Sequence, residues 1–171
     1  MILADVLKYV FLILGALIVI VACWLASAAL VPRLVERAQQ SYATRPVRIT
    51  ITGVLVGFPL VLAGAALVNG GVHPVLKLFG GVLVGLPVLL GLVGSAGLSE
   101  RVGLGLVHAD DARTPWRRSM RGGTVLALTF LLPFIGWFVF LPWTLLSGLG
   151  AAVAALRAPR MDESVALVAA A

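Results

Sequence analysis

The residues best suited to chemistry in this sequence form the short run His108-Ala109-Asp110-Asp111. An imidazole and two carboxylates within four positions could hold a divalent cation or a phosphate-bound magnesium ion. The spacing is not specific to such a site, and no second cluster of histidines or carboxylates accompanies it to complete a metal shell. We therefore predict a solvated loop at this position and expect no metal and no cofactor.

Motifs of nucleophilic, nucleotide-dependent and zinc chemistry are also missing from the sequence. There is no GxSxG elbow, no phosphate-binding loop and no paired-cysteine metal motif. We expect a protein that is not an enzyme.

The single cysteine, Cys23, lies next to two patterns that resemble processing signals. Ile20-Val21-Ala22-Cys23 fits a lipoprotein box, and Ala26-Ser27-Ala28 fits a small-residue cleavage site. The apolar run continues through the cysteine, and Lys8 is the only basic residue before it. We expect an uncleaved membrane anchor in which the Cys23 thiol is an ordinary buried group.

Composition indicates the class of protein that must position these residues. Of 171 residues, 61% are hydrophobic and 12% are charged, and the mean hydropathy is +1.10. Such a chain predicts one polytopic membrane domain over residues 1–171. The net charge of +6 comes from basic residues beside apolar runs, which is typical of topology determinants and of headgroup contacts rather than of nucleic-acid binding.

Apolar runs of the required length predict an all-α helical bundle. A crossing helix needs about 20 apolar residues, and three clear spans are expected at about 9–30, 49–68 and 75–98. The last apolar stretch, 122–156, is interrupted at 133–137. It predicts either a hairpin, with its turn at the far surface, or one kinked crossing, and the charge pattern below favours the hairpin.

The decapeptides GVLVGFPLVL (53–62) and GVLVGLPVLL (81–90) agree at seven of ten positions and fall in two antiparallel spans. Their glycines are four residues apart and so share a helix face, which predicts close helix packing. An inverted repeat around a transport site is the alternative, but the two spans lack ionisable side chains at mid-membrane, which favours packing. The predicted packing glycines are Gly53, Gly57, Gly81, Gly85 and Gly148, and the predicted helix breaks are Pro59, Pro87, Pro133, Gly136 and Pro142.

Positive charge predicts the orientation, since loops on the cytoplasmic side collect Lys and Arg. Loops 31–48 and 99–121 hold nine of the 13 basic residues, so both are expected inside and the amino terminus outside. A hairpin after Gly122 would also return Arg157 and Arg160 to the inside. We expect a multi-pass protein of the cytoplasmic (inner) membrane.

The run before the last apolar stretch combines an aromatic residue with three arginines: Trp116, Arg117, Arg118 and Arg121. Such a surface would attract anionic lipid or dock a partner protein.

The segment GGTVLALTFLLPFIGWFVFLPWTLLSGLGAAVAAL, together with the earlier Gly85-Leu86-Pro87, resembles the membrane region of bacterial proteins that carry a bactofilin-like polymer-forming domain. The resemblance covers about the last two-thirds of the chain and implies a membrane module that anchors or accompanies such a scaffold. The polymer-forming β domain itself is missing here, so filament formation does not carry over. We expect a non-catalytic anchor or assembly partner in a membrane complex or homo-oligomer; the alternative is a small pore or transporter subunit.

Overall fold

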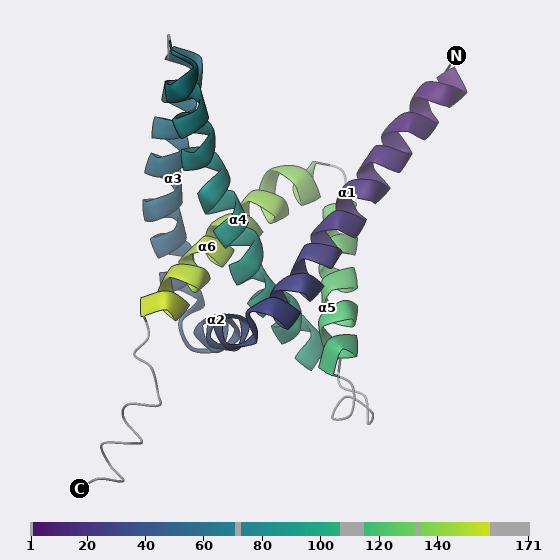
Figure 1. Ribbon diagram of the computed structural model, residues 1–171. Coiled ribbons are helices and arrows are strands. Elements are labelled where there is room, and N and C mark those ends of the chain that lie inside the picture. Colours follow the sequence, from purple (N-terminus) through teal and green to yellow (C-terminus); the bar gives the residue numbers. More distant parts are fainter. Residues whose placement is uncertain (1, 71–72, 107–114, 133, 158–171) are drawn as a thin grey trace, which may run out of the picture.

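The computed structural model describes residues 2–70, 73–106, 115–132 and 134–157 (Figure 1). In these ranges the chain is helical and contains no strand, so the prediction of an all-α bundle is confirmed. The helices are α1 (Ile2–Leu30), α2 (Pro32–Thr44), α3 (Pro46–Gly70), α4 (Pro74–Leu104), α5 (Pro115–Phe130), the π-helical η1 (Gly136–Phe140) and α6 (Leu141–Arg157).

Prolines set where several of these helices begin. Pro32, Pro46, Pro74 and Pro115 are each the first residue of a helix. A proline fits the first helical position because its missing N–H would have no partner there and its φ angle is already helical. The corners at Val31 and Arg45 therefore separate α2 from the apolar helices on either side of it.

Four helical segments are long and apolar enough to cross a membrane: Asp5–Leu30, Pro46–Gly70, Pro74–Leu104 and Gly136–Arg157. At 1.5 Å per residue, the 25 residues of α3 extend about 37 Å, enough for a hydrocarbon core of about 30 Å. The three clear spans predicted from sequence are confirmed as α1, α3 and α4. The chain is a multi-pass membrane protein.

The last apolar stretch folds back on itself, as the favoured hairpin prediction requires. Helix α5 ends at Phe130, and α6 runs back toward the end of the molecule where α5 begins (Figure 1). The turn lies well below the upper ends of α1, α3 and α4, so it does not reach the level at which those helices end (Figure 1). The 16 residues of α5 extend only about 24 Å, too short to cross.

The turn bonds part of its own backbone, which suits a position at membrane depth. The N–H groups of Leu131 and Leu132 donate to carbonyls three residues earlier, and that of Gly136 donates to Leu132 O. Phe134 has a left-handed φ of 64°, which reverses the chain direction. The predicted break at Gly136 is confirmed, since this residue follows the turn and begins η1; Pro133 lies outside the described residues.

Three of the predicted helix breaks are wrong. Pro59 and Pro87 lie inside α3 and α4, which continue past them. A proline removes only one N–H donor, and in an apolar environment the remaining backbone groups still require helical partners. Pro142 follows the π-helical turn, in which Leu141 N–H donates to Gly136 O five residues earlier, and the helix continues through it.

Glycines lie at the points where helices cross, and α4 is the central helix. A Cβ on Gly53 of α3 or Gly150 of α6 would overlap a carbonyl oxygen of the opposite helix. Gly94 of α4 and Gly148 of α6 meet in the same way. Further contacts on α4 use Gly80 toward α3, Gly97 toward α2 and Gly103 toward Gly122 of α5. Because lipid tails are as apolar as the helices, such backbone-level packing drives their association.

The repeated decapeptides therefore have different roles in the fold. Gly53 and Gly57 face α6, and Gly148 faces α4, so these three predicted packing positions are confirmed. Gly81 and Gly85 have no atom within 4 Å of an added Cβ, so the prediction that they pack is wrong within this chain. The face of α4 that meets α3 includes Gly80, about 100° around the helix from Gly81.

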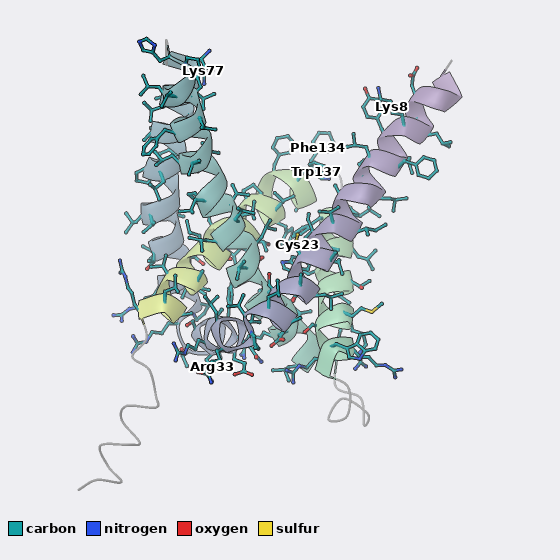
Figure 2. The ribbon with its side chains drawn as sticks, viewed as in Figure 1. Lys8, Cys23, Arg33, Lys77, Phe134 and Trp137 are labelled. Atoms are coloured by element: carbon teal, nitrogen blue, oxygen red, sulfur yellow. The ribbon has the colours of Figure 1, made fainter. Side chains whose placement is uncertain are left out.

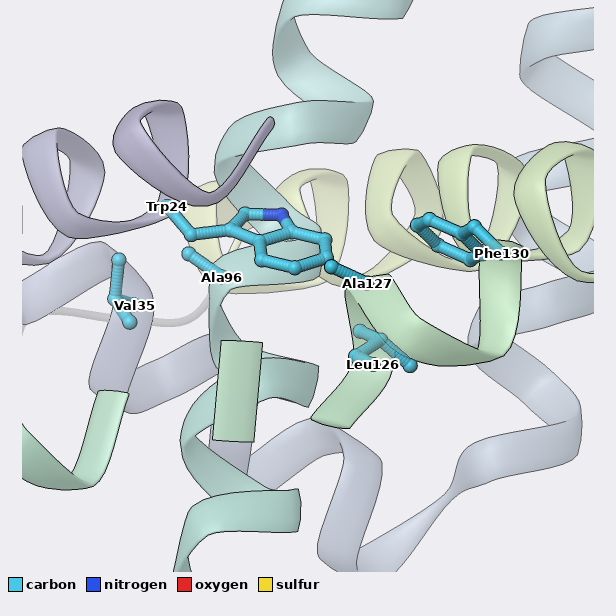
Figure 3. Packing of buried hydrophobic residues seen from close by; sticks show 6 residues of the cluster. All are labelled: Trp24, Val35, Ala96, Leu126, Ala127 and Phe130. Carbon is cyan, nitrogen blue, oxygen red and sulfur yellow. The ribbon is translucent and has the colours of Figure 1, made fainter. Parts of the chain in front are cut away.

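A hydrophobic cluster joins the second half of α1 to the rest (Figure 3). Trp24 is 1% exposed and packs with Phe130 at a ring-centroid distance of 6.2 Å. The other buried members are Val35, Ala96, Leu126 and Ala127. The first half of α1 diverges from this cluster, and its side chains are largely exposed to the surroundings, among them Tyr9, Phe11 and Leu12.

Candidate functional site

Two buried hydrogen bonds connect aromatic donors to serines of the central helices. The Trp24 indole Nε1 donates to Ser95 Oγ at 2.8 Å, and Ser95 donates to Leu92 O. The Tyr42 hydroxyl donates to Ser147 Oγ at 3.1 Å, and Ser147 donates to Thr144 O. Each serine thus accepts one bond and donates another.

These serines hold helices together. A nucleophilic serine needs a base within hydrogen-bond reach, but both hydroxyl protons here are bonded to carbonyls of their own helix. The sequence did not predict these two hydrogen-bonded serines, because an isolated serine in an apolar span forms no recognisable pattern. Small residues beside them, Gly94 and Gly148, were the available signal.

Tyr42 lies in α2, outside the spanning helices, and is 6% exposed. Burial raises the pKa of its hydroxyl to about 12, and the hydrogen bond to Ser147 opposes part of that rise. The neutral phenol is therefore the form that the fold stabilises.

The base of the α5–α6 hairpin is attached to α4 by a buried carboxylate. Glu100 Oε1 accepts a hydrogen bond from Ser119 Oγ at 3.0 Å, and Glu100 Oε2 lies 3.8 Å from an Arg118 guanidinium nitrogen. Arg118 Nε is buried with no hydrogen-bond partner in the described chain. The Arg118 side chain is 28% exposed and pairs with the carboxylate of Glu100, so its assignment to a lipid or partner surface stays a prediction.

The other residues of that predicted surface lie at the outer end of α5. Trp116 is 55% exposed, and the Arg117 guanidinium lies over its ring, 5.6 Å from the centroid. Arg121 donates from Nε to Arg117 O at 3.4 Å. These contacts hold an aromatic and basic group at the start of α5, where sequence reasoning placed it.

A metal site and the thiol of the single cysteine are two further candidates for chemistry in the part of the chain that the structure describes. No group of three or more His, Cys, Asp or Glu side chains could hold an ion there. His108, Asp110 and Asp111 lie outside the described residues. Cys23 is partly exposed on α1, which runs unbroken through it, so its expected burial is only partial (Figure 2).

An apolar pocket of about 180 Å³ lies where α1, α4 and α6 meet the end of α5. Its walls include Ile20, Val88, Leu92 and Leu145. The hydroxyl of Ser95, which also lines it, is already bonded. The pocket therefore offers hydrocarbon rather than ligands for an ion.

Comparison with known proteins gives no match, whether to a protein-family model, to a curated protein or to a solved structure. What the fold and these sites define is a class: a multi-pass helical membrane protein with a glycine-packed centre.

Proposed function

We propose that this protein is a non-catalytic membrane anchor or assembly partner of the cytoplasmic membrane. One observation carries the proposal: α4 is packed at backbone distance against α2, α3, α5 and α6 through glycines along its length. A centre packed in this way leaves its helices little freedom to open a polar path. The buried hydroxyls beside it are bonded internally.

The alternative, a pore or transporter subunit, has less support. An inverted-repeat transporter binds its substrate where equivalent repeats meet. Here Gly53 and Gly57 are packed, while Gly81 and Gly85 face outward, so the two decapeptides have different surroundings. In the described chain the buried carboxylate, Glu100, lies near the end of α4 and is bonded to α5.

Charge favours an orientation with the amino terminus outside. Lys8 and Lys77 lie toward one end of the molecule and Arg33 at the other (Figure 2). The end that holds Arg33 also holds the basic residues of five segments: α2, the start of α3, the end of α4, the start of α5 and the end of α6. By the positive-inside rule this end is cytoplasmic, and we call it the basic end.

The basic end is the surface on which an assembly partner would dock. It combines the exposed side of α2 with the Trp116 and Arg117 pair of α5. The resemblance to the membrane region of bactofilin-like proteins supports a scaffold as the kind of partner.

Reconstitution tests the proposal. Purified protein in liposomes should give no flux of ions or small solutes above that of empty vesicles, because the central helices leave no hydrated path. Purification in mild detergent should recover a stoichiometric partner, and Arg117→Gln together with Arg121→Gln should weaken its binding. Selective solute flux would overturn the anchor proposal, even if a partner were also recovered.

A further inference from the structure

A polar notch lies at the corner where α2 ends and α3 begins, beside the last turns of α6. Its volume is about 450 Å³. Arg45 and Arg48 line it together with three hydroxyl side chains, Ser41, Thr44 and Thr52. We propose that this corner notch binds the phosphate headgroup of an anionic phospholipid.

Among the described residues, no carboxylate neutralises the positive charge of the two arginines. Neither guanidinium makes a hydrogen bond or an ion pair within the residues that the structure describes. Glu100 pairs with Arg118, and Glu36 precedes Arg45 by nine residues along α2, about 13 Å. A guanidinium presents a planar set of donors that matches phosphate oxygens, so two of them in one notch form a phosphate site.

The hydroxyls complement the arginines in hydrogen bonding. Ser41, Thr44 and Thr52 each donate to the carbonyl four residues earlier, at 2.9, 3.0 and 2.9 Å. Their protons are therefore used, and each oxygen keeps lone pairs that can accept a bond. An anionic headgroup that also carries hydroxyls, such as that of phosphatidylglycerol, provides phosphate for the arginines and donors for these oxygens.

The notch continues into a surface suited to acyl chains. Its apolar floor is Ile49 and Ala154. Farther along α3, toward the membrane centre, Ile51 and Leu55 are 53% and 69% exposed. A lipid with its phosphate in the notch can lay its chains along this side of α3. Basic pockets between helices on the cytoplasmic side bind anionic headgroups in this way.

The corner notch differs from the arginine group at the start of α5. There, Arg118 is engaged by Glu100, and Arg117 lies over Trp116. The proposal rests on the membrane placement of the basic end but not on the anchor role, so solute flux in liposomes would leave it intact.

Native mass spectrometry of delipidated protein in detergent tests the site with phosphatidylglycerol and phosphatidylcholine as probes. The full chain should retain one phosphatidylglycerol in preference to phosphatidylcholine. In the double variant Arg45→Gln/Arg48→Gln, affinity for phosphatidylglycerol should fall about 30-fold, because each arginine contributes about 1 kcal/mol to binding. The matched control Arg33→Gln/Arg101→Gln removes two exposed charges from the same end and should lose less than about threefold.

Two further arms identify the source of the phosphate and exclude misfolding. Inorganic phosphate should not displace phosphatidylglycerol, because it lacks chains to lie along α3. The Arg45→Lys/Arg48→Lys variant should keep part of the binding, and near-ultraviolet circular dichroism should match between all variants. Equal losses in the two glutamine variants, displacement by inorganic phosphate, or tighter binding of an acidic peptide than of the lipid would overturn the proposal.

Discussion

Adding one methyl group to α3 at Gly53 should weaken the whole bundle. A Cβ at this position would overlap Leu146 O and lie 2.7 Å from the carbonyl carbon of Leu146 and 3.0 Å from the amide nitrogen of Gly150. All three atoms belong to the backbone of α6, so no side-chain rotation can make room. The two helices must separate, as they must for a methyl group at Gly150, which would overlap Ile49 O.

The expected change in the free energy of unfolding of Gly53→Ala is the difference between two opposing effects. Overpacking a tight contact costs about 1–3 kcal/mol, and a backbone neighbour favours the upper end of that range. Alanine is a better helix former than glycine by about 1 kcal/mol, which offsets part of the cost. We expect Gly53→Ala to lower the free energy of unfolding by about 2 kcal/mol, from the difference between these effects.

The chain contains its own matched control. Gly53 and Gly81 each begin a copy of the pentapeptide Gly-Val-Leu-Val-Gly, but nothing lies within 4 Å of a Cβ added at Gly81. Gly81→Ala should keep only the helix-propensity gain and be as stable as the parent or slightly more so. Stability is measured by titrating each variant from mild detergent into sodium dodecyl sulfate and following helix content. Equal midpoints for Gly53→Ala and Gly81→Ala would refute the packing argument.

Three further predictions concern the polar contacts. Because burial raises the pKa of Tyr42 from 10.0 to about 12, the folded state keeps a proton that the unfolded state loses above pH 10. In a denaturation series from about pH 9 to 11, the free energy of unfolding should therefore fall above pH 10 by up to about 1.4 kcal/mol per pH unit. The fall should be smaller in Tyr42→Phe. Glu100→Gln should lower the free energy of unfolding by about 1–2 kcal/mol in the same titration, a modest loss because the ion pair is partly exposed. Glu36→Gln, on the exposed side of α2, should leave the free energy of unfolding unchanged. Trp24→Phe and Ser95→Ala should show a coupling of about 1 kcal/mol in a double-mutant cycle, and strict additivity would contradict the hydrogen bond.

Much of the fold could be predicted from the sequence because a bilayer permits few structures. Apolar length gave the three clear spans, and basic loops favoured the hairpin after Gly122. The prolines at 32, 46 and 74 begin helices in the structure, whereas the predicted helix breaks Pro59 and Pro87 do not end one. A proline can end a helix where water forms a hydrogen bond with the freed carbonyl, but an apolar span contains no water to form that bond.

The packing contacts were only partly predictable, because they depend on helix rotation. Gly53 and Gly81 have the same local sequence, yet one is packed and the other faces outward. Rotation is set by partners distant in the chain, here α6 against α3 and α4. For the same reason the ion pair of Arg118 could not be predicted from its place between Arg117 and Ser119, because its partner, Glu100, lies 18 residues earlier.

Thiol labelling tests the central claim, that the basic end faces the cytoplasm and the α5–α6 turn stops within the membrane. In a Cys23→Ser background, single variants Gln40→Cys in α2, His73→Cys before α4 and Ile135→Cys in the turn are treated with an impermeant maleimide. His73→Cys should react in intact cells, Gln40→Cys only after the membrane is opened, and Ile135→Cys in neither condition. Labelling of Gln40→Cys in intact cells would contradict the orientation, and labelling of Ile135→Cys from outside would contradict the re-entrant hairpin.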